Sequence, residues 1–177
     1  KEGVEPPSLA YSNNPLIKEN WMDNVIAKFP NGHGVSVFEI IDIDNDDDLD
    51  IVIGNHQGDV YILKNPFPDN IDEGWEKYKV NNYNVDKGHD LREIDLGDID
   101  SDGDLDIIVA DEGNNMIMWF ENNGKTFFEN WNEHIIDKSD QYLKWCHSVE
   151  IEDIDGDGAL DIAVAVAGSI VFLLYLN

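Results

Sequence analysis

Aspartates recur at fixed spacing in three nine-residue windows of this sequence. The windows read DIDNDDDLD (42–50), DIDSDGDLD (98–106) and DIDGDGALD (153–161), and they hold 15 of the 38 acidic residues. Like charges this close together raise the free energy unless a cation neutralises them. Oxygen ligands without His or Cys favour a hard divalent cation such as Ca²⁺ over zinc or copper. The windows therefore predict three calcium sites.

The spacing within each window fits a loop that curls around one ion. Carboxylates stand at loop positions 1, 3, 5 and 9, and position 7 is expected to supply a backbone carbonyl oxygen. Position 6 needs a positive φ and is Gly103 or Gly158, but Asp47 stands there in the first loop, which we expect to be the most strained. The predicted ligands are Asp42, Asp44, Asp46, Asp48, Asp50, Asp98, Asp100, Asp102, Asp104, Asp106, Asp153, Asp155, Asp157, Ala159 and Asp161.

A helical calcium loop is the main alternative for windows of this kind. An EF-hand requires a bidentate Glu at position 12 between two helices, whereas that position is Ile53, Val109 or Val164 here. The segments that follow the loops read DIVIG, DIIVA and DIAVA, and they are typical of short buried strands. The sequence therefore predicts loops between strands.

The loops belong to an internal repeat of about 55 residues, since the first loop aspartate recurs at 42, 98 and 153. Each unit places an alternating strand before the loop, a buried strand after it, a third strand ending in Asn, and in the first two units a fourth segment that opens with Trp. Four strands in each unit are typical of a propeller blade. We predict an all-β fold of three β-propeller-type blades of four antiparallel strands, with the calcium loop between the first and second strands.

The third unit reaches Asn177 without a fourth strand, while a Trp-led segment of the fourth-strand type lies at 21–29. We expect residues 1–20 to form an irregular N-terminal arm and residues 21–177 a three-repeat propeller-like domain. An unpaired third strand exposes backbone donors and acceptors that can pair with another strand. The 21–29 strand or a partner chain should therefore complete the last blade. This arrangement predicts a homo-oligomer or a filament built through strand completion.

These features resemble the FG-GAP/VCBS repeat family. The resemblance rests on GDIDSDGDLDIIVA (97–110) with its two sister loops, on the W-x-x-H-I-I pattern at Trp131 and on HSVEIED from His147, and it covers residues 21–177. Similar repeats occur in integrin α-subunit heads, fungal lectins, bacterial surface proteins and polysaccharide lyases. The resemblance implies calcium, a β-propeller and an extracellular or cell-surface location, but no single activity. Asp47 and the presence of only three units depart from the family pattern.

Composition excludes several classes of function. A formal charge of −27 argues against binding to nucleic acid or to anionic lipid, and no apolar run is long enough for membrane insertion. The single cysteine, Cys146, rules out an internal disulfide framework and is expected to be a small buried hydrophobe. His33 and His89 each stand nine residues before a loop aspartate, and we expect them to hydrogen-bond within their own blades, although a paired-histidine site is the alternative.

The first functional hypothesis is a non-catalytic, calcium-stabilised extracellular module for glycan or protein binding or for self-assembly. The alternatives are a structural subunit of an extracellular fibre, and a polysaccharide lyase or its accessory domain. Neither GxSxG nor a non-repeating group of His, Tyr and Arg is present, and Arg92 is the only arginine, which argues against an enzyme. Aromatic residues that do not all follow the repeat are candidates for a glycan-stacking surface, namely Trp119, Tyr61, Tyr142 and Trp145.

Overall fold

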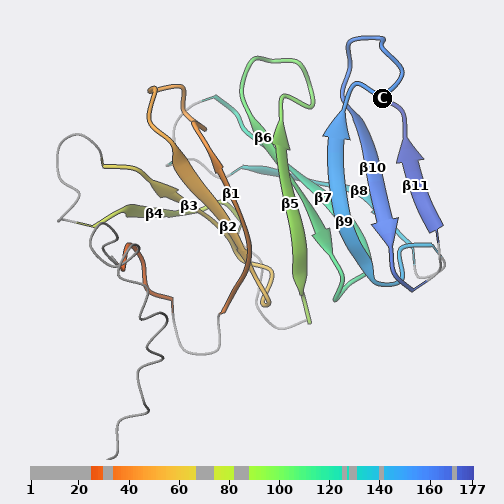
Figure 1. The fold of residues 1–177 in the computed structure, drawn as a ribbon, viewed down its shortest axis with the longest axis horizontal. Coiled ribbons are helices and arrows are strands. Elements are labelled where there is room, and N and C mark those ends of the chain that lie inside the picture. The colour runs from red at the N-terminus through yellow and green to blue at the C-terminus, as the bar shows by residue number, and fades with distance from the viewer. Residues whose placement is uncertain are drawn as a thin grey trace, which may run out of the picture.

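The computed structural model describes residues 25–29, 34–66, 74–81, 88–124, 127, 131–139, 142–168 and 171–177. These residues form eleven strands in three antiparallel sheets, which confirms the predicted all-β class. Figure 1 shows the three sheets side by side in chain order. No helix that is long and apolar enough to cross a bilayer occurs within these ranges.

Each sheet corresponds to one predicted repeat and follows the chain from strand to strand. The first sheet contains β1 (Val35–Ile41), β2 (Asp50–Asn55), β3 (Val60–Lys64) and β4 (Glu76–Lys79). The second sheet contains β5 (Leu91–Gly97), β6 (Asp106–Asp111), β7 (Met116–Glu121) and β8 (Asn132–Lys138). The third sheet contains β9 (Cys146–Glu152), β10 (Asp161–Val166) and β11 (Val171–Tyr175).

The first hairpin of every sheet ends in the same way at its loop. Ile41 pairs with Asp50, Gly97 with Asp106 and Glu152 with Asp161. The ninth residue of each acidic window is therefore the first residue of the second strand, as the spacing predicted. Because the three hairpins run in the same direction, their loops lie together along the upper edge in Figure 1.

Two apolar cores hold the row of sheets together. The first lies between the first and second sheets and includes Ile62, Val109 and Phe120. The second lies between the second and third sheets and includes Ile117 and Val149. Alternating side chains supply both cores, because successive residues of a strand point to opposite faces and the middle sheet is covered on each face.

The described sheets do not close into a ring. The first strands of the three sheets lie side by side in chain order: β1 contacts β5, and β5 contacts β9, whereas β1 and β9 do not meet. Side-by-side first strands are the arrangement of propeller blades, but the predicted propeller is present here as an open row of three sheets.

The expected strand at 21–29 does not complete the third sheet in this chain, as far as the structure describes it. Residues 21–24 lie outside the described residues, and residues 25–29 form no strand. That segment packs on the first sheet, where Lys77 Nζ donates to the Lys28 carbonyl (3.3 Å) and the Phe29 ring lies 5.3 Å from that of Tyr61. Residues 25–29 therefore contact the first sheet, whereas β11, the strand they were expected to pair with, belongs to the third sheet.

Candidate metal centres

The structure brings three aspartates of each loop together at one point. Loop positions 1, 3 and 9 each offer a carboxylate oxygen, and the three oxygens lie within 4.8 Å of one another in every loop. Calcium binds oxygen at roughly 2.3–2.6 Å, so one ion holds oxygens up to about 5 Å apart. These oxygen clusters therefore fit the predicted ion, and they comprise Asp42, Asp44 and Asp50; Asp98, Asp100 and Asp106; and Asp153, Asp155 and Asp161.

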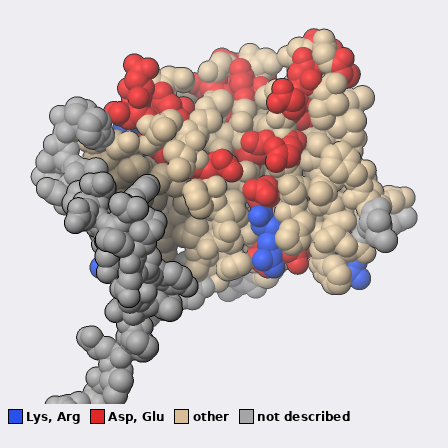
Figure 2. Space-filling view, viewed as in Figure 1, with Lys and Arg blue, Asp and Glu red and all other residues tan. Residues whose placement is uncertain are grey.

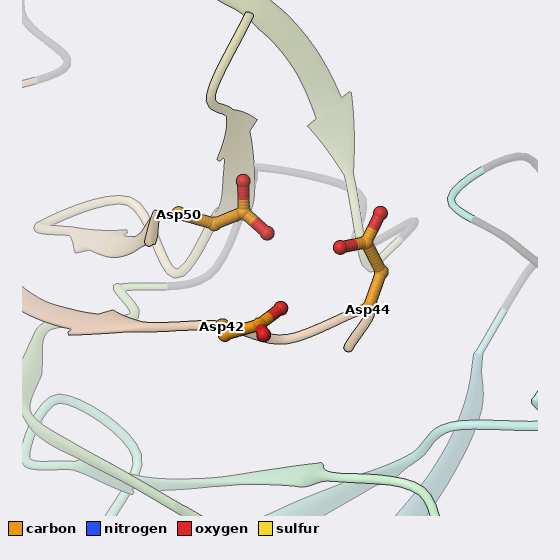
Figure 3. Close-up of side chains that lie close together, drawn as sticks. All are labelled: Asp42, Asp44 and Asp50. Atoms are coloured by element: carbon orange, nitrogen blue, oxygen red, sulfur yellow. The ribbon is translucent and has the colours of Figure 1, made fainter. Parts of the chain in front are cut away.

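Figure 3 shows this arrangement in the first loop, where the carboxylates of Asp42, Asp44 and Asp50 face one shared space. Asp42 follows the last residue of β1, Asp44 lies within the loop, and Asp50 begins β2. Acidic side chains also cover the upper edge of the molecule in Figure 2, where the loops lie. The sheets thus gather a dense negative charge at one edge.

The carboxylate at position 1 organises the backbone of its own loop. Asp98 accepts hydrogen bonds from the backbone N–H of Asp102 (2.9 Å) and of Gly103 (3.0 Å). Asp42 accepts equivalent bonds from the residues four and five positions further, and Asp153 from those three and five positions further. Each loop is therefore curled by its first ligand, and the carboxylates of positions 3 and 9 lie close to it.

The carboxylate at position 9 is buried and is held by the end of the third strand. Asp106 is fully buried and accepts from the backbone N–H of Asn122 (2.8 Å) and of Ile99 (3.0 Å). The backbone N–H groups of Asn65 and Asn177 bond to Asp50 and Asp161 in the same way, at 2.7 and 2.9 Å. The recurrent Asn thus orients the buried ligand, a role that its repeated place after the third strand could have indicated.

Two positions of each loop have a positive φ. Position 6 was predicted, and Asp47 adopts φ 70° there while Gly103 adopts φ 99°. Position 4 was missed, and it is Asn45, Ser101 or Gly156, with φ values of 56°, 62° and 81°. Asn and Gly enter the left-handed region more readily than most residues, and this preference was the available signal. The first loop is the only one of the three with a non-Gly residue at position 6.

Burial and mutual repulsion raise the pKa of several loop carboxyls. Desolvation raises the pKa of Asp106 to about 6, although hydrogen bonds from Asn122 and Ile99 oppose it. Desolvation also raises the pKa of Asp50 and, together with the charge of Asp102, that of Asp100. Carboxyls with raised pKa values are under electrostatic strain when ionised, and a bound cation relieves that strain.

A lysine side chain from the end of β3 lies beside the first loop, a contact that the sequence analysis missed. Lys64 Nζ contacts the carboxylates of Asp44 and of Asp46, the latter at 3.0 Å. The Lys64 hydrogen bond lowers the pKa of Asp46; burial would lower the pKa of Lys64, but its two carboxylate partners raise it. The equivalent residues, which also precede the recurrent Asn, are Glu121 and Leu176. Among the described residues, the first loop is therefore the one with an ammonium beside its predicted ion.

The remaining predicted ligands lie outside the groups of three. At position 5, Asp46, Asp102 and Asp157 each use one carboxylate oxygen to accept the N–H of position 7, at 2.9–3.0 Å. Their second oxygens and the position-7 carbonyls of Asp48, Asp104 and Ala159 stay predicted ligands. Each loop thus offers a predicted ion three clustered carboxylates.

Comparison with known families identifies part of this pattern. A family model described as an FG-GAP-like repeat matches residues 98–164, from the first ligand of the second loop to β10. This chain carries an FG-GAP-like repeat. The resemblance inferred from the sequence is confirmed over that segment, which spans the second and third loops. A comparison with curated proteins gives no match for this chain.

Outside the acidic loops, charged side chains form a network at the opposite ends of the strands. His89 pairs with the buried Asp111 of its own sheet, as predicted, whereas His33 lies outside the described residues. Arg92 Nη2 lies 2.7 Å from Asp90 and its Nε lies 2.6 Å from Glu112. The single arginine is therefore engaged by two carboxylates of the protein itself.

The candidate glycan-stacking residues lie in different parts of the structure. Tyr61 belongs to β3 of the first sheet and lies beside Phe29. Trp119 belongs to the second sheet and stacks on His134, with ring centroids 4.3 Å apart. Trp119 also lines a cavity of about 390 Å³ between the second and third sheets. Tyr142 and Trp145 are about half exposed in the connection before β9. The four rings therefore do not make one shared surface.

Proposed function

We propose that this chain is a non-catalytic repeat module that Ca²⁺ stabilises and that acts in binding or assembly at a cell surface. The observation that carries the proposal is the threefold recurrence of an all-oxygen aspartate cluster at the same hairpin of three sheets. The extracellular setting is supported by the FG-GAP-like repeat and by an oxygen ligand set suited to calcium at millimolar concentration.

Calcium would stabilise the fold by linking the strands that supply its ligands. Each cluster joins the end of the first strand, the loop and the start of the second strand, while the recurrent Asn ties in the third strand. With about 1 mM calcium and a dissociation constant of about 10–100 µM, linkage stabilises the fold by roughly 1.5–3 kcal/mol per site. Three such sites approach the stability of an average domain.

A chelator experiment tests this proposal. Thermal unfolding followed by circular dichroism, in 1 mM CaCl₂ and then in excess EGTA, should show a fall in Tm of tens of degrees, with recovery when calcium is restored. Magnesium at the same concentration is the control, because it demands a smaller octahedral site. An unchanged Tm in EGTA would contradict calcium stabilisation.

The non-catalytic role is supported by the partners of the ionisable groups. Arg92, which a lyase would need for an acidic sugar, is paired with Asp90 and Glu112. Burial raises the pKa of Cys146 to about 12, so its thiol is not activated. Incubation with a panel of uronic-acid polymers should give no absorbance from unsaturated products, and a calcium-dependent rise would support the lyase alternative.

The fibre-subunit alternative is favoured by the edge of the third sheet. Among the described residues, β11 has a strand neighbour on one side, β10, whereas the equivalent strands β3 and β7 each have two. A partner chain could add the missing strand there, because an unpaired edge presents free backbone donors and acceptors. Calcium-dependent fibrils seen by electron microscopy would support this alternative.

A further inference from the structure

The two faces of a sheet have different roles in the row, and we name them accordingly. The trailing face of a sheet is the one that points toward the next sheet in chain order, and the leading face is the opposite one. The trailing face of the second sheet packs on the third sheet, and its leading face packs on the first. Ile99, Ile108 and Ile117 of the trailing face are at most 7% exposed, because the third sheet covers them. Ile94 of the leading face is 2% exposed, because the first sheet covers it.

The trailing face of the third sheet carries the repeat-equivalent residues but is open. Ile154 and Phe172 stand 55 residues after Ile99 and Ile117, and they are 49% and 69% exposed. Leu174 continues the same face of β11 and is 46% exposed. Apolar positions that are buried in the second sheet are thus exposed in the third, beside the exposed Glu150 of the same face, and exposed apolar patches with a polar rim on soluble proteins mark interaction sites.

The leading face of the first sheet is open only along its inner strand, since Ile53 and Leu63 of the same face are 4% and 3% exposed. Phe38 and Ile40 on β1 are 58% and 54% exposed. Their equivalents in the third sheet, Val149 and Ile151, are 0% and 8% exposed because the second sheet covers them. The outer half of this leading face, on β3, already carries the Phe29 contact with Tyr61, so the open part lies on the inner strand.

We propose that the open trailing face of the third sheet binds the open leading face of the first sheet in a second copy of this chain, head to tail. The two internal junctions are the argument, because in both of them a trailing face of this repeat is covered by a leading face. The described row presents an open trailing face at one end and, at the other, a leading face whose inner strand is open. The new contact would continue the same packing across a chain boundary.

This contact differs from the strand completion expected from the sequence. The partner would cover side chains of a sheet face, while the outer edge of β11 would take no part. Phe172 and Phe38, which the test substitutes, lie on strands outside the acidic loops, whereas Ile154 lies between the predicted ligands Asp153 and Asp155, so the test is made with calcium present. Two copies joined at both junctions would form a ring of six sheets, and an array joined at one junction per copy would stay open.

The test places one charge on each face and measures mass by light scattering from 10 to 200 µM in 1 mM CaCl₂. The wild-type chain should have at least twice its 20.1 kDa monomer mass. Phe172→Glu and Phe38→Glu should each weaken association more than tenfold, because either charge would be buried in an apolar contact. An equimolar mixture of the two variants should recover a pair of copies, since it retains one junction in which both faces are intact.

Ile135→Glu is the matched control, because Ile135 is 60% exposed on β8 and belongs to a sheet that is covered on both sides. This variant should associate as the wild type does. Unchanged circular dichroism and calcium titrations in all three variants would separate a lost contact from a lost fold or a lost metal site.

Two results would overturn the proposal. A wild-type chain that stays monomeric at 200 µM would show that a second copy does not cover these faces. Association that Phe172→Glu abolishes but Phe38→Glu leaves intact would show that two trailing faces meet instead, and Phe38→Glu would then associate without its mixing partner. Open polymers that both substitutions disrupt, and that the mixture reduces to pairs, would support the face assignment and favour the fibre function.

Discussion

The ammonium of Lys64 beside the first loop gives a sharp prediction about the order in which the loops bind calcium. The first loop should bind most weakly, and Lys64→Met should increase its affinity. Lys64 pairs with Asp44 and Asp46, so calcium must displace or tolerate a positive charge there. The second and third loops carry Glu121 and Leu176 at the equivalent place, so that position supplies no competing cation there.

The exposure of these side chains limits the size of the effect. The Lys64 side chain is 29% exposed and its two partners are 24% and 37% exposed, so solvent screens both pairs. Pairs of this kind contribute about 0.2–1 kcal/mol each, and two of them correspond to a change of about 2- to 30-fold in the dissociation constant. Residual repulsion between the ammonium and calcium acts in the same direction.

Residue-resolved NMR titration is the assay, since each loop has its own reporter. The backbone amides of Asp47, Gly103 and Gly158 occupy the same position in the three loops. In Lys64→Met, the calcium midpoint of Asp47 should fall, while those of the two glycines should stay where they are. Lys77→Met is the matched control, because Lys77 lies on the same sheet but over the rings of Phe29 and Tyr61.

An unchanged or higher midpoint at Asp47 in Lys64→Met would refute the competition. The same conclusion would follow if Lys77→Met shifted that midpoint equally, since the effect would then come from net charge. If Asp47 titrates last in the wild type and remains last without Lys64, the cause lies in its backbone conformation.

Two further predictions concern the loop backbone and the buried thiol. Gly103→Ala should lower the stability by about 1 kcal/mol and weaken calcium binding at the second loop, because Gly103 has φ 99°. Gly74→Ala, at φ 86° away from the loops, should cost similar stability in chemical denaturation without changing the calcium midpoint. Cys146 is fully buried and has its pKa raised to about 12, so at pH 8.5 it should react with a thiol reagent about a thousandfold more slowly than in the unfolded chain. Since the folded chain holds this proton more tightly, stability should also decrease from about pH 8.5 towards pH 12, and Cys146→Val should remove that part of the decrease. Rapid labelling of the native thiol, or an equal calcium effect of the two glycine substitutions, would count against these assignments.

Most of the strand pattern and the position of the acidic loops could be predicted from sequence. The alternation at Ile94 and Leu96 fixed the face of β5, and the step from 42 to 98 to 153 fixed the repeat. These features are local, since strand faces depend on a period of two and the loops on spacing within nine residues. The structure confirms them in all three sheets.

The features that sequence analysis missed depend on contacts between distant residues. Lys64 reaches the first loop from the end of β3, and the backbone of Asn122 reaches Asp106 from the end of β7. The position of residues 25–29 was also missed, because a Trp-led segment fits a fourth strand in pattern whichever sheet it packs on. Register within a hairpin can be deduced from spacing, but the choice of partner surface cannot.

The central claim, that each aspartate cluster holds one calcium ion, is tested most directly by the amount of metal bound. After equilibrium dialysis against 1 mM CaCl₂, elemental analysis should give three calcium ions per chain. Asp98→Asn should reduce this to two, because Asp98 both supplies a ligand oxygen and curls the second loop. A wild-type chain that binds no calcium, or an Asp98→Asn chain that keeps all three ions, would contradict the account.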